Sequence, residues 1–173
     1  MLVIKKENPP ANISIDIDEY IPFTIAVISA VESSPLYWRS GDGKNSLVEI
    51  GLDRYSGSVC SVTLTAINPK KVEETSAPIR TDLRESFGMA VFDIGAWLSD
   101  SNNYSDSFQD EFDNDLVLVI GEDYLALLIE NSGEPVRYII NGQLRFSITA
   151  NGVLSAIEIL DLDENQIGRL RQK

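Results

Sequence analysis

The sequence predicts a mainly β protein with antiparallel sheets, built from two related hairpin-containing halves and ending in a short C-terminal helix. An α+β fold is the alternative. Three observations support the β class: short apolar runs alternate with clusters of turn residues, few windows have helical periodicity, and one β-hairpin pattern occurs twice.

The repeated hairpin is centred on a turn glycine, Gly57 in the first copy and Gly152 in the second. Glycine takes a positive φ at little cost, which suits a tight turn between two strands. Counted from the glycine, the inward positions of the return strands match in pairs: Val59 with Leu154, Val62 with Ile157, and Leu64 with Ile159.

The chain of 173 residues is long enough to bury a core as a single domain, 1–173. We expect its halves to span 13–67 and 89–160, joined by a linker at 68–78. Because a lone hairpin is marginal in water, the halves should fold together and stack their apolar faces.

In the first half, residues 13–18 alternate between apolar and polar, as in a half-buried strand. The tract 23–31 is apolar on both faces, and its β-branched residues favour a strand over a helix. Residues 40–45 form a turn cluster, whose Gly41-Asp42-Gly43-Lys44 lacks the spacing of a phosphate-binding loop.

The second half opens with 82–87, for which we expect one helical turn, and with the apolar tract 89–98. Further on, Asn141-Gly142 is the strongest two-residue hairpin signal in the chain. The remaining elements expected here are strands at 116–120, 124–129 and 136–140, the second hairpin copy, and a terminal helix opened by Asp163 and Glu164.

Two residue types constrain the chemistry. The chain has no histidine and one cysteine, Cys60. Histidine-dependent nucleophilic sites, histidine-ligated zinc and thiolate metal centres are therefore excluded, and we expect no cofactor. Nothing indicates an oxidising compartment, a signal peptide or an apolar run of membrane-spanning length, so we expect a cytoplasmic protein with no membrane partner.

The net charge of −13 is unevenly distributed. Up to Arg80 there are 8 basic and 10 acidic residues, a net charge of −2, whereas from Thr81 onward 6 basic and 17 acidic residues give −11. Such a surface repels nucleic acid and speeds encounters with a basic protein, although acidity also serves solubility alone.

The acidic tract 99–115 contains no basic residue and interleaves aromatic residues with carboxylates. It fits a calcium loop poorly, because Tyr104 stands where an oxygen ligand belongs and the loop glycine is missing. As a functional element, the tract would be a docking surface for a basic protein. As a structural element, it would be a solvated loop whose aromatic residues pack into the core. Phe108 and Phe112 would share a face on a helical turn. The candidate partner-binding residues are Asp100, Tyr104, Asp106, Phe108, Asp110, Glu111, Phe112, Asp113 and Asp115.

Other candidates have simple structural interpretations. Trp38 and Trp97 are expected in the core, and Cys60 as an inert small residue on a strand. Glu49 or Asp53 could meet Glu158 as an acid pair of an unusual hydrolase. We prefer to interpret these acids as outward-facing strand charges.

Two motifs carry a resemblance to other proteins. The segment from Leu47 to Leu64 matches L-x-E-x-G-[LI]-D-x-x-[ST]-G-x-[VI]-x-S-[VI]-T-L, and Gly152 to Leu160 matches the closing pattern of small bacterial domains. The chain resembles a loose group of bacterial β-rich proteins of unknown role, some of which are found beside secreted toxins as suspected immunity factors. No functional residue follows from this resemblance.

The sequence therefore favours a non-enzymatic acidic protein that binds a basic protein, such as an immunity protein that neutralises a toxin. The alternatives are a self-associating module that pairs its sheet edges in a homodimer, and the carboxylate-based hydrolase.

Overall fold

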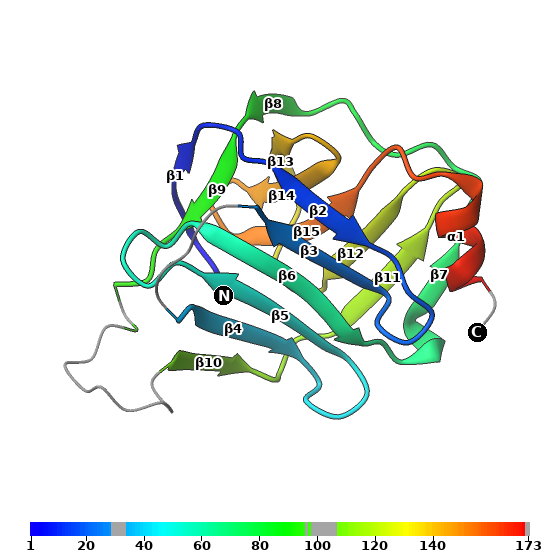
Figure 1. Cartoon of the computed structure of the whole chain (residues 1–173), viewed down its shortest axis with the longest axis horizontal. Helices are drawn as coiled ribbons and strands as arrows, with labels where there is room; N and C mark the ends of the chain where they lie inside the picture. Colours follow the sequence, from blue (N-terminus) through cyan, green and yellow to red (C-terminus); the bar gives the residue numbers. More distant parts are fainter. Residues whose placement is uncertain (29–33, 96, 98–106, 172–173) are drawn as a thin grey trace.

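The chain forms two large β-sheets, a two-stranded ribbon and one short α-helix (Figure 1). The structure is a computed structural model that describes residues 1–28, 34–95, 97 and 107–171. The mainly β class and the C-terminal helix expected from the sequence are confirmed.

The first sheet has six strands in the order β10-β4-β5-β6-β3-β2. All neighbours are antiparallel except β10 and β4, which run parallel. The strands are β2 (Ile13–Asp16), β3 (Phe23–Val27), β4 (Leu36–Gly41), β5 (Leu47–Leu52), β6 (Val59–Ala66) and β10 (Phe108–Glu111).

The second sheet has seven strands in the order β7-β11-β12-β15-β14-β13-β8. The edge strands β7 and β8 run parallel to their neighbours, and the other pairs are antiparallel. The strands are β7 (Val72–Glu74), β8 (Arg84–Phe87), β11 (Leu116–Ile120), β12 (Leu125–Ile129), β13 (Pro135–Asn141), β14 (Leu144–Thr149) and β15 (Leu154–Ile159).

The two sheets share a six-strand plan centred on the repeated hairpins, β5–β6 and β14–β15. β4 and β3 flank the first hairpin as β13 and β12 flank the second, and β2 and β11 come next. A parallel strand, β10 in one sheet and β8 in the other, completes each plan. The turn glycines Gly57 and Gly152 both have a φ of +77°. The duplication seen in the sequence is therefore a duplication of sheet topology.

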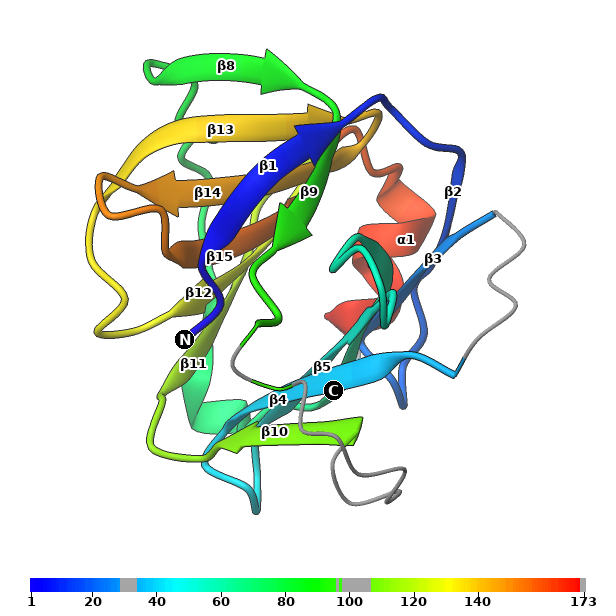
Figure 2. The same ribbon diagram turned by 90° about the vertical axis from the view of Figure 1, so that its left-hand side faces the viewer.

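The ribbon pairs β1 (Ile4–Asn8) with β9 (Met89–Phe92) and joins the two sheets at one end of the molecule (Figure 2). The Phe92 N–H donates to the Gly57 carbonyl at 2.9 Å, and the Ile4 N–H donates to the Gly152 carbonyl at 2.8 Å. β9 lies within the tract expected to begin the second half, yet it belongs to the ribbon.

The apolar faces of the sheets form one core, and α1 (Glu164–Leu170) packs against it through Ile167 and Leu170. Alternation along β6 sends Val62 and Leu64 inward, while Thr63 lies on the outer face. Asp163 caps α1 in a capping box, as expected for a helix opened by this residue. Within the described residues, no helix has the length and apolar character needed to cross a membrane.

Three local expectations need correction. The helical turn at 82–87 is the strand β8, because its backbone completes a ladder with β13. The segment 68–78 contains a 3₁₀ helix (Pro69–Lys71) and β7, so it is more than a linker. In the β13–β14 hairpin, Asn141 pairs with Leu144, which makes Gly142-Gln143 the two loop residues.

Residues 75–83, which we call the strap, connect β7 to β8 at opposite edges of the seven-stranded sheet. They run over its outer face, at the left of Figure 2. The Thr75 N–H donates to the Ile120 carbonyl at 3.0 Å, and the Tyr124 hydroxyl donates to the Ala77 carbonyl at 3.2 Å.

Candidate functional site

The described part of the acidic tract lies at one edge of the six-stranded sheet. Residues 108–111 form β10, and residues 112–115 lead into β11. Asp100, Tyr104 and Asp106, which are three of the candidate partner-binding residues, lie outside the described residues.

Phe108 and Phe112 do not share a helical turn, because Phe108 is the first residue of β10 and Phe112 follows its last residue. Phe108 stacks on Tyr37 with ring centroids 5.6 Å apart, and the Arg39 guanidinium lies 4.4 Å from the centroid of Phe108 and 5.9 Å from that of Phe112. Phe112 is 43% exposed and its ring lies against Gly43. Aromatic groups and a cation therefore share this edge.

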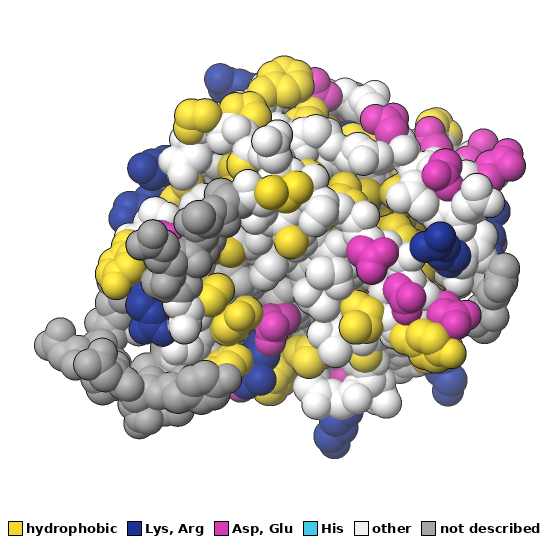
Figure 3. All heavy atoms as spheres, in the orientation of Figure 1, with side chains coloured by type: hydrophobic (Ala, Val, Ile, Leu, Met, Phe, Trp, Pro, Cys, Tyr) yellow, Lys and Arg dark blue, Asp and Glu magenta, His cyan; other side chains and the backbone are white. Residues whose placement is uncertain are grey.

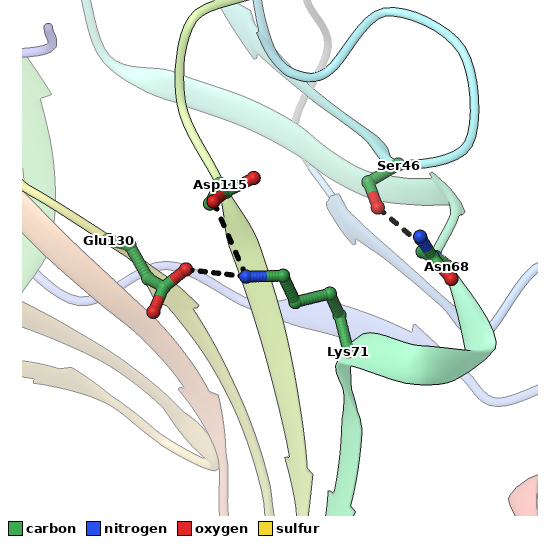
Figure 4. A network of polar contacts seen from close by, with 5 residues as sticks. All are labelled: Ser46, Asn68, Lys71, Asp115 and Glu130. Atoms are coloured by element: carbon green, nitrogen blue, oxygen red, sulfur yellow. Dashed lines mark hydrogen bonds and ion pairs between the residues drawn. The ribbon is translucent and has the colours of Figure 1, made fainter.

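Most described carboxylates of the tract are already paired with cations of the same chain. Asp110 accepts two hydrogen bonds from Arg39, at 2.7 and 2.8 Å, and Glu111 pairs with the N-terminal ammonium group. Asp115 lies 3.3 Å from the Lys71 ammonium, which also contacts Glu130 at 2.9 Å (Figure 4). The fold thus supplies the basic residues that the tract itself lacks, and this reduces the charge available to a partner.

The same part of the molecule is fixed by buried polar contacts. The Asn114 amide donates to the Ser40 hydroxyl at 2.9 Å, and the Asn68 N–H donates to the Ser46 hydroxyl at 3.1 Å (Figure 4). These contacts tie the β10–β11 connection to β4, and the segment after β6 to the turn between β4 and β5. The polar groups at this edge therefore hold neighbouring segments of the fold together.

A second acidic surface, around α1, was not identified from the sequence. The turn before β12 contacts the connection before α1, because the Leu162 N–H donates to the Asp123 carbonyl at 2.8 Å. The turn between β2 and β3 contacts α1 through Arg169, which donates to the Ile17 carbonyl at 3.1 Å. We call this surface the acidic end; its carboxylates are Asp16, Asp18, Glu19, Glu74, Glu122, Asp123, Asp161, Asp163 and Glu164.

The acidic end also exposes apolar groups. Tyr20 is 79% exposed and Ile21 42% exposed, in a turn organised by the Asp18 carboxylate, which accepts the Tyr20 N–H at 2.7 Å. Beside them a cleft of about 270 Å³ opens between the sheets and α1, with walls that include Pro22, Ile67, Val72 and Leu170. Acidic side chains gather on the right of the face in Figure 3, where Figure 1 places α1.

The sequence shows these carboxylates, but it does not show that they lie close together in space. Acidic turns at 121–123 and 161–164 are visible in the sequence, yet only the sheet topology brings both beside the turn at 18–21. Ion pairing is limited here: Arg171 lies 3.3 Å from Glu74. Glu19, Glu122, Asp161 and Glu164 form no ion pair within the part of the chain that the structure describes.

The acid pair of the hydrolase alternative does not form. Glu49 lies on the outer face of the six-stranded sheet and Glu158 on the outer face of the seven-stranded sheet, with the whole core between them. Asp53 is used in the hairpin turn, where hydrogen bonds from Ser56 lower the pKa of its carboxyl. These positions give no support to paired-carboxylate catalysis.

Glu158 also contradicts the expectation of an outward, solvated strand charge, because it is 7% exposed. It accepts hydrogen bonds from the Arg145 guanidinium and, at 3.2 Å, from the Ser147 hydroxyl. The guanidinium lies 4.0 Å from the centroid of the Tyr138 ring. A charged cluster is thus buried on the outer face of the second sheet, which the strap crosses.

The remaining candidate residues behave as structural groups. Trp38 is buried in the core as expected, and Trp97 packs against it. Burial raises the pKa of the Cys60 thiol to about 11, which keeps it protonated and unreactive at neutral pH. Asp42 accepts backbone N–H groups of Lys44, Asn45 and Ser46, which closes the β4–β5 turn and lowers the pKa of its carboxyl.

Comparison with known proteins adds no family assignment. No protein-family model matches the chain, and no curated protein has a significantly similar sequence.

Proposed function

We propose that this protein acts by binding a positively charged protein through the acidic end. One observation carries the proposal: exposed apolar groups, Tyr20 and Ile21, stand beside an apolar cleft and are surrounded by carboxylates. In protein interfaces of this kind, buried aromatic anchors contribute most of the binding energy, and the charged rim raises the association rate.

The net charge supports the same partner class. At −13 the chain attracts a basic surface over a distance set by ionic screening, about 8 Å at physiological salt. The resemblance to bacterial proteins found beside secreted toxins suggests a basic toxin, such as a nuclease, as the partner. The protein would then act as an immunity factor by covering the toxin's basic groove.

The surface around β10 is the weaker candidate. Its carboxylates Asp110, Glu111 and Asp115 are neutralised within the chain, so a basic partner would have to displace existing ion pairs. Asp113 is exposed and serves as a probe of this surface.

The test begins with capture of the partner from a native lysate at low salt, followed by association kinetics with the purified partner. We expect the association rate to fall steeply as salt rises. The variant Glu19→Gln/Glu122→Gln/Asp161→Asn should slow association by about tenfold. The matched control Glu85→Gln/Asp93→Asn/Asp113→Asn removes the same number of charges elsewhere and should have little effect.

Tyr20→Ala tests the apolar anchor separately. Loss of an anchor should speed dissociation and weaken affinity by about tenfold or more, with little change in the association rate. Association that is independent of ionic strength and of the acidic-end substitutions would contradict the proposal. A larger effect of the control variant would move the interface away from the acidic end, and the same effect from Asp113→Asn alone would place it at β10.

Self-association is the second candidate function, and the edge strand β8 favours it. Phe87, in this strand, is 70% exposed, and Val136 in the adjacent β13 is 46% exposed. Proteins usually protect sheet edges from pairing with a second copy, so an exposed phenylalanine at an edge is notable. Light scattering over a dilution series tests this candidate: a dimer that Phe87→Lys dissociates would support it, and a monomer throughout would exclude it.

A further inference from the structure

The outer face of the seven-stranded sheet contains a hollow of about 500 Å³ between the strap and the β12–β13 turn. Its floor follows one row of cross-strand neighbours: Leu128, Ala156, Ser147 and Tyr138. Arg80 of the strap forms part of the wall. The hollow thus has a rigid floor made of four neighbouring strands.

The floor is polar although it is buried. Tyr138 and Ser147 are each 1% exposed, and Glu158, which also lines the hollow, is 7% exposed. Outer faces of antiparallel sheets usually present their polar groups to water, so this concentration of buried polar groups needs a cause.

Some hydrogen-bonding capacity in and behind this floor is unused. Among the described residues, the Tyr138 hydroxyl makes no hydrogen bond to another protein group. Of the Arg145 guanidinium, which stacks on the Tyr138 ring, Nη2 is buried and has no partner among these residues. Burial raises the pKa of Tyr138, so its hydroxyl is a donor at neutral pH. A ligand group that accepts from the Tyr138 hydroxyl would add a hydrogen bond that the protein itself does not supply.

Charge around the hollow selects the class of ligand. Glu158 is paired with Arg145, Glu130 with Lys71 at 2.9 Å, and Arg80 with Asp82 at 2.5 Å. The lining itself contains one cation, Arg80, and three carboxylates, Glu130, Glu134 and Glu158. Together with the partner groups behind it, three cations stand against four carboxylates. A strongly charged ligand of either sign meets a like charge, whereas a neutral ligand meets none.

We propose that this hollow binds a small neutral molecule with several hydroxyl groups, such as a monosaccharide. A hydroxyl both donates and accepts, so one such group can accept from Tyr138 while another donates to Glu158. Leu128 and Ala156 offer apolar contact to the C–H groups of a sugar ring. The hollow lies in the size range of small-molecule sites.

The first experiment is a titration followed by backbone amide NMR of the whole chain. The neutral probes are D-glucose, D-galactose, D-mannose and glycerol; glucosamine and glucuronate are charged sugars of matched ring size. We expect at least one neutral probe to shift the amides of Leu128, Ser147 and Ala156 with a Kd of about 1 mM or below. The charged sugars should bind at least about fivefold more weakly.

A lack of response to every neutral probe would overturn the proposal. Tighter binding of glucosamine or glucuronate than of all neutral probes would also overturn it, because the charge-balance argument would then be wrong.

Substitution separates a ligand-binding role from a structural one. Tyr138→Phe removes a hydroxyl without a described partner, so the melting temperature should stay the same or rise while probe affinity falls about tenfold. Tyr37→Phe is the matched control, because Tyr37 occupies the corresponding position of the six-stranded sheet, opposite Gly51 as Tyr138 is opposite Ser147. It should leave probe affinity unchanged. Probe affinity unaffected by Tyr138→Phe would contradict the proposed contact.

Discussion

Ile4 and Phe92 are cross-strand partners in the β1–β9 ribbon, and each donates its backbone N–H to the turn glycine of a different repeated hairpin. Phe92 contacts Gly57 of the first hairpin, and Ile4 contacts Gly152 of the second. The residues beside them form matching bridges, Val91 with Ser58 and Val3 with Val153. The ribbon thus relates the two hairpins by a local pseudo-twofold.

Because of this arrangement, each half of the sequence contributes a strand that contacts the other half. β1, which precedes the first repeated hairpin in the chain, contacts the second hairpin. β9, which lies between the two hairpins in the chain, contacts the first. The parallel edge strand β10 likewise joins the sheet built by the earlier part of the chain. Because each half completes the other, we expect the two sheets to unfold in one cooperative transition.

Substitution of the turn glycines tests the ribbon contact. Both have a φ of +77°, but a Cβ at position 57 would lie 2.1 Å from the Phe92 carbonyl oxygen, while one at position 152 would meet the Ile4 side chain at 3.2 Å. Backbone cannot move away as a side chain can. We expect Gly57→Ala to lower the free energy of unfolding by more than about 2 kcal/mol and Gly152→Ala by about 1–2 kcal/mol, measured by urea denaturation.

Gly142→Ala is the matched control for these two substitutions. Its φ is +61°, and no heavy atom lies within 4 Å of the place that the added methyl group would take, so only the backbone preference is lost. The expected cost is about 1 kcal/mol. Equal losses at positions 57 and 142 would show that the contact with β9 contributes nothing beyond the turn itself.

The hairpins were predictable from sequence because their signals are local. Apolar alternation around Gly57 and Gly152 fixes which side chains face the core, and the structure follows it at Val62 and Ile157. β8 was missed because four residues at a sheet edge carry almost no periodic signal. Its strand state comes from pairing with β13, which lies far along the chain.

The candidate site was less predictable, for a physical reason. Local sequence shows that the tract 99–115 lacks basic residues, but not that Arg39, Lys71 and the N-terminus would neutralise Asp110, Asp115 and Glu111. Long-range ion pairing is a property of topology. The same holds for Glu158, whose partner Arg145 lies directly across the hairpin and could be identified once the register was known.

The Arg145–Glu158 pair should be costly to break and cheap to replace. Glu158→Gln leaves a buried guanidinium without its counter-charge, and we expect a loss of about 3–5 kcal/mol in the free energy of unfolding. The double variant Arg145→Met/Glu158→Leu removes both charges and should recover most of that loss. A double variant less stable than Glu158→Gln would show that the pair stabilises the fold outright.

Acid should destabilise the protein partly through two turn carboxyls. Hydrogen bonds from backbone N–H groups lower the pKa of Asp42, and the Ser56 hydroxyl and N–H lower that of Asp53. A lowered pKa in the folded state gives stability that is present above the ordinary carboxyl pKa and is lost as the pH falls through the folded value. Asp42→Asn/Asp53→Asn keeps an accepting oxygen and should show a shallower loss of stability below about pH 4 in urea denaturation.

Cys60 should react slowly while the chain is folded. Burial, with a smaller contribution from Asp53, raises the pKa of its thiol to about 11, and the thiolate is the reactive form. At pH 8 the native protein should be alkylated by iodoacetamide about a hundredfold more slowly than the denatured chain.

The raised pKa of the Cys60 thiol also gives stability that is full below the ordinary thiol pKa and is lost as the pH rises to about 11. Cys60→Ser should therefore flatten the alkaline limb of a stability profile, and alkylation at equal rates in both states would refute the shielding of this thiol.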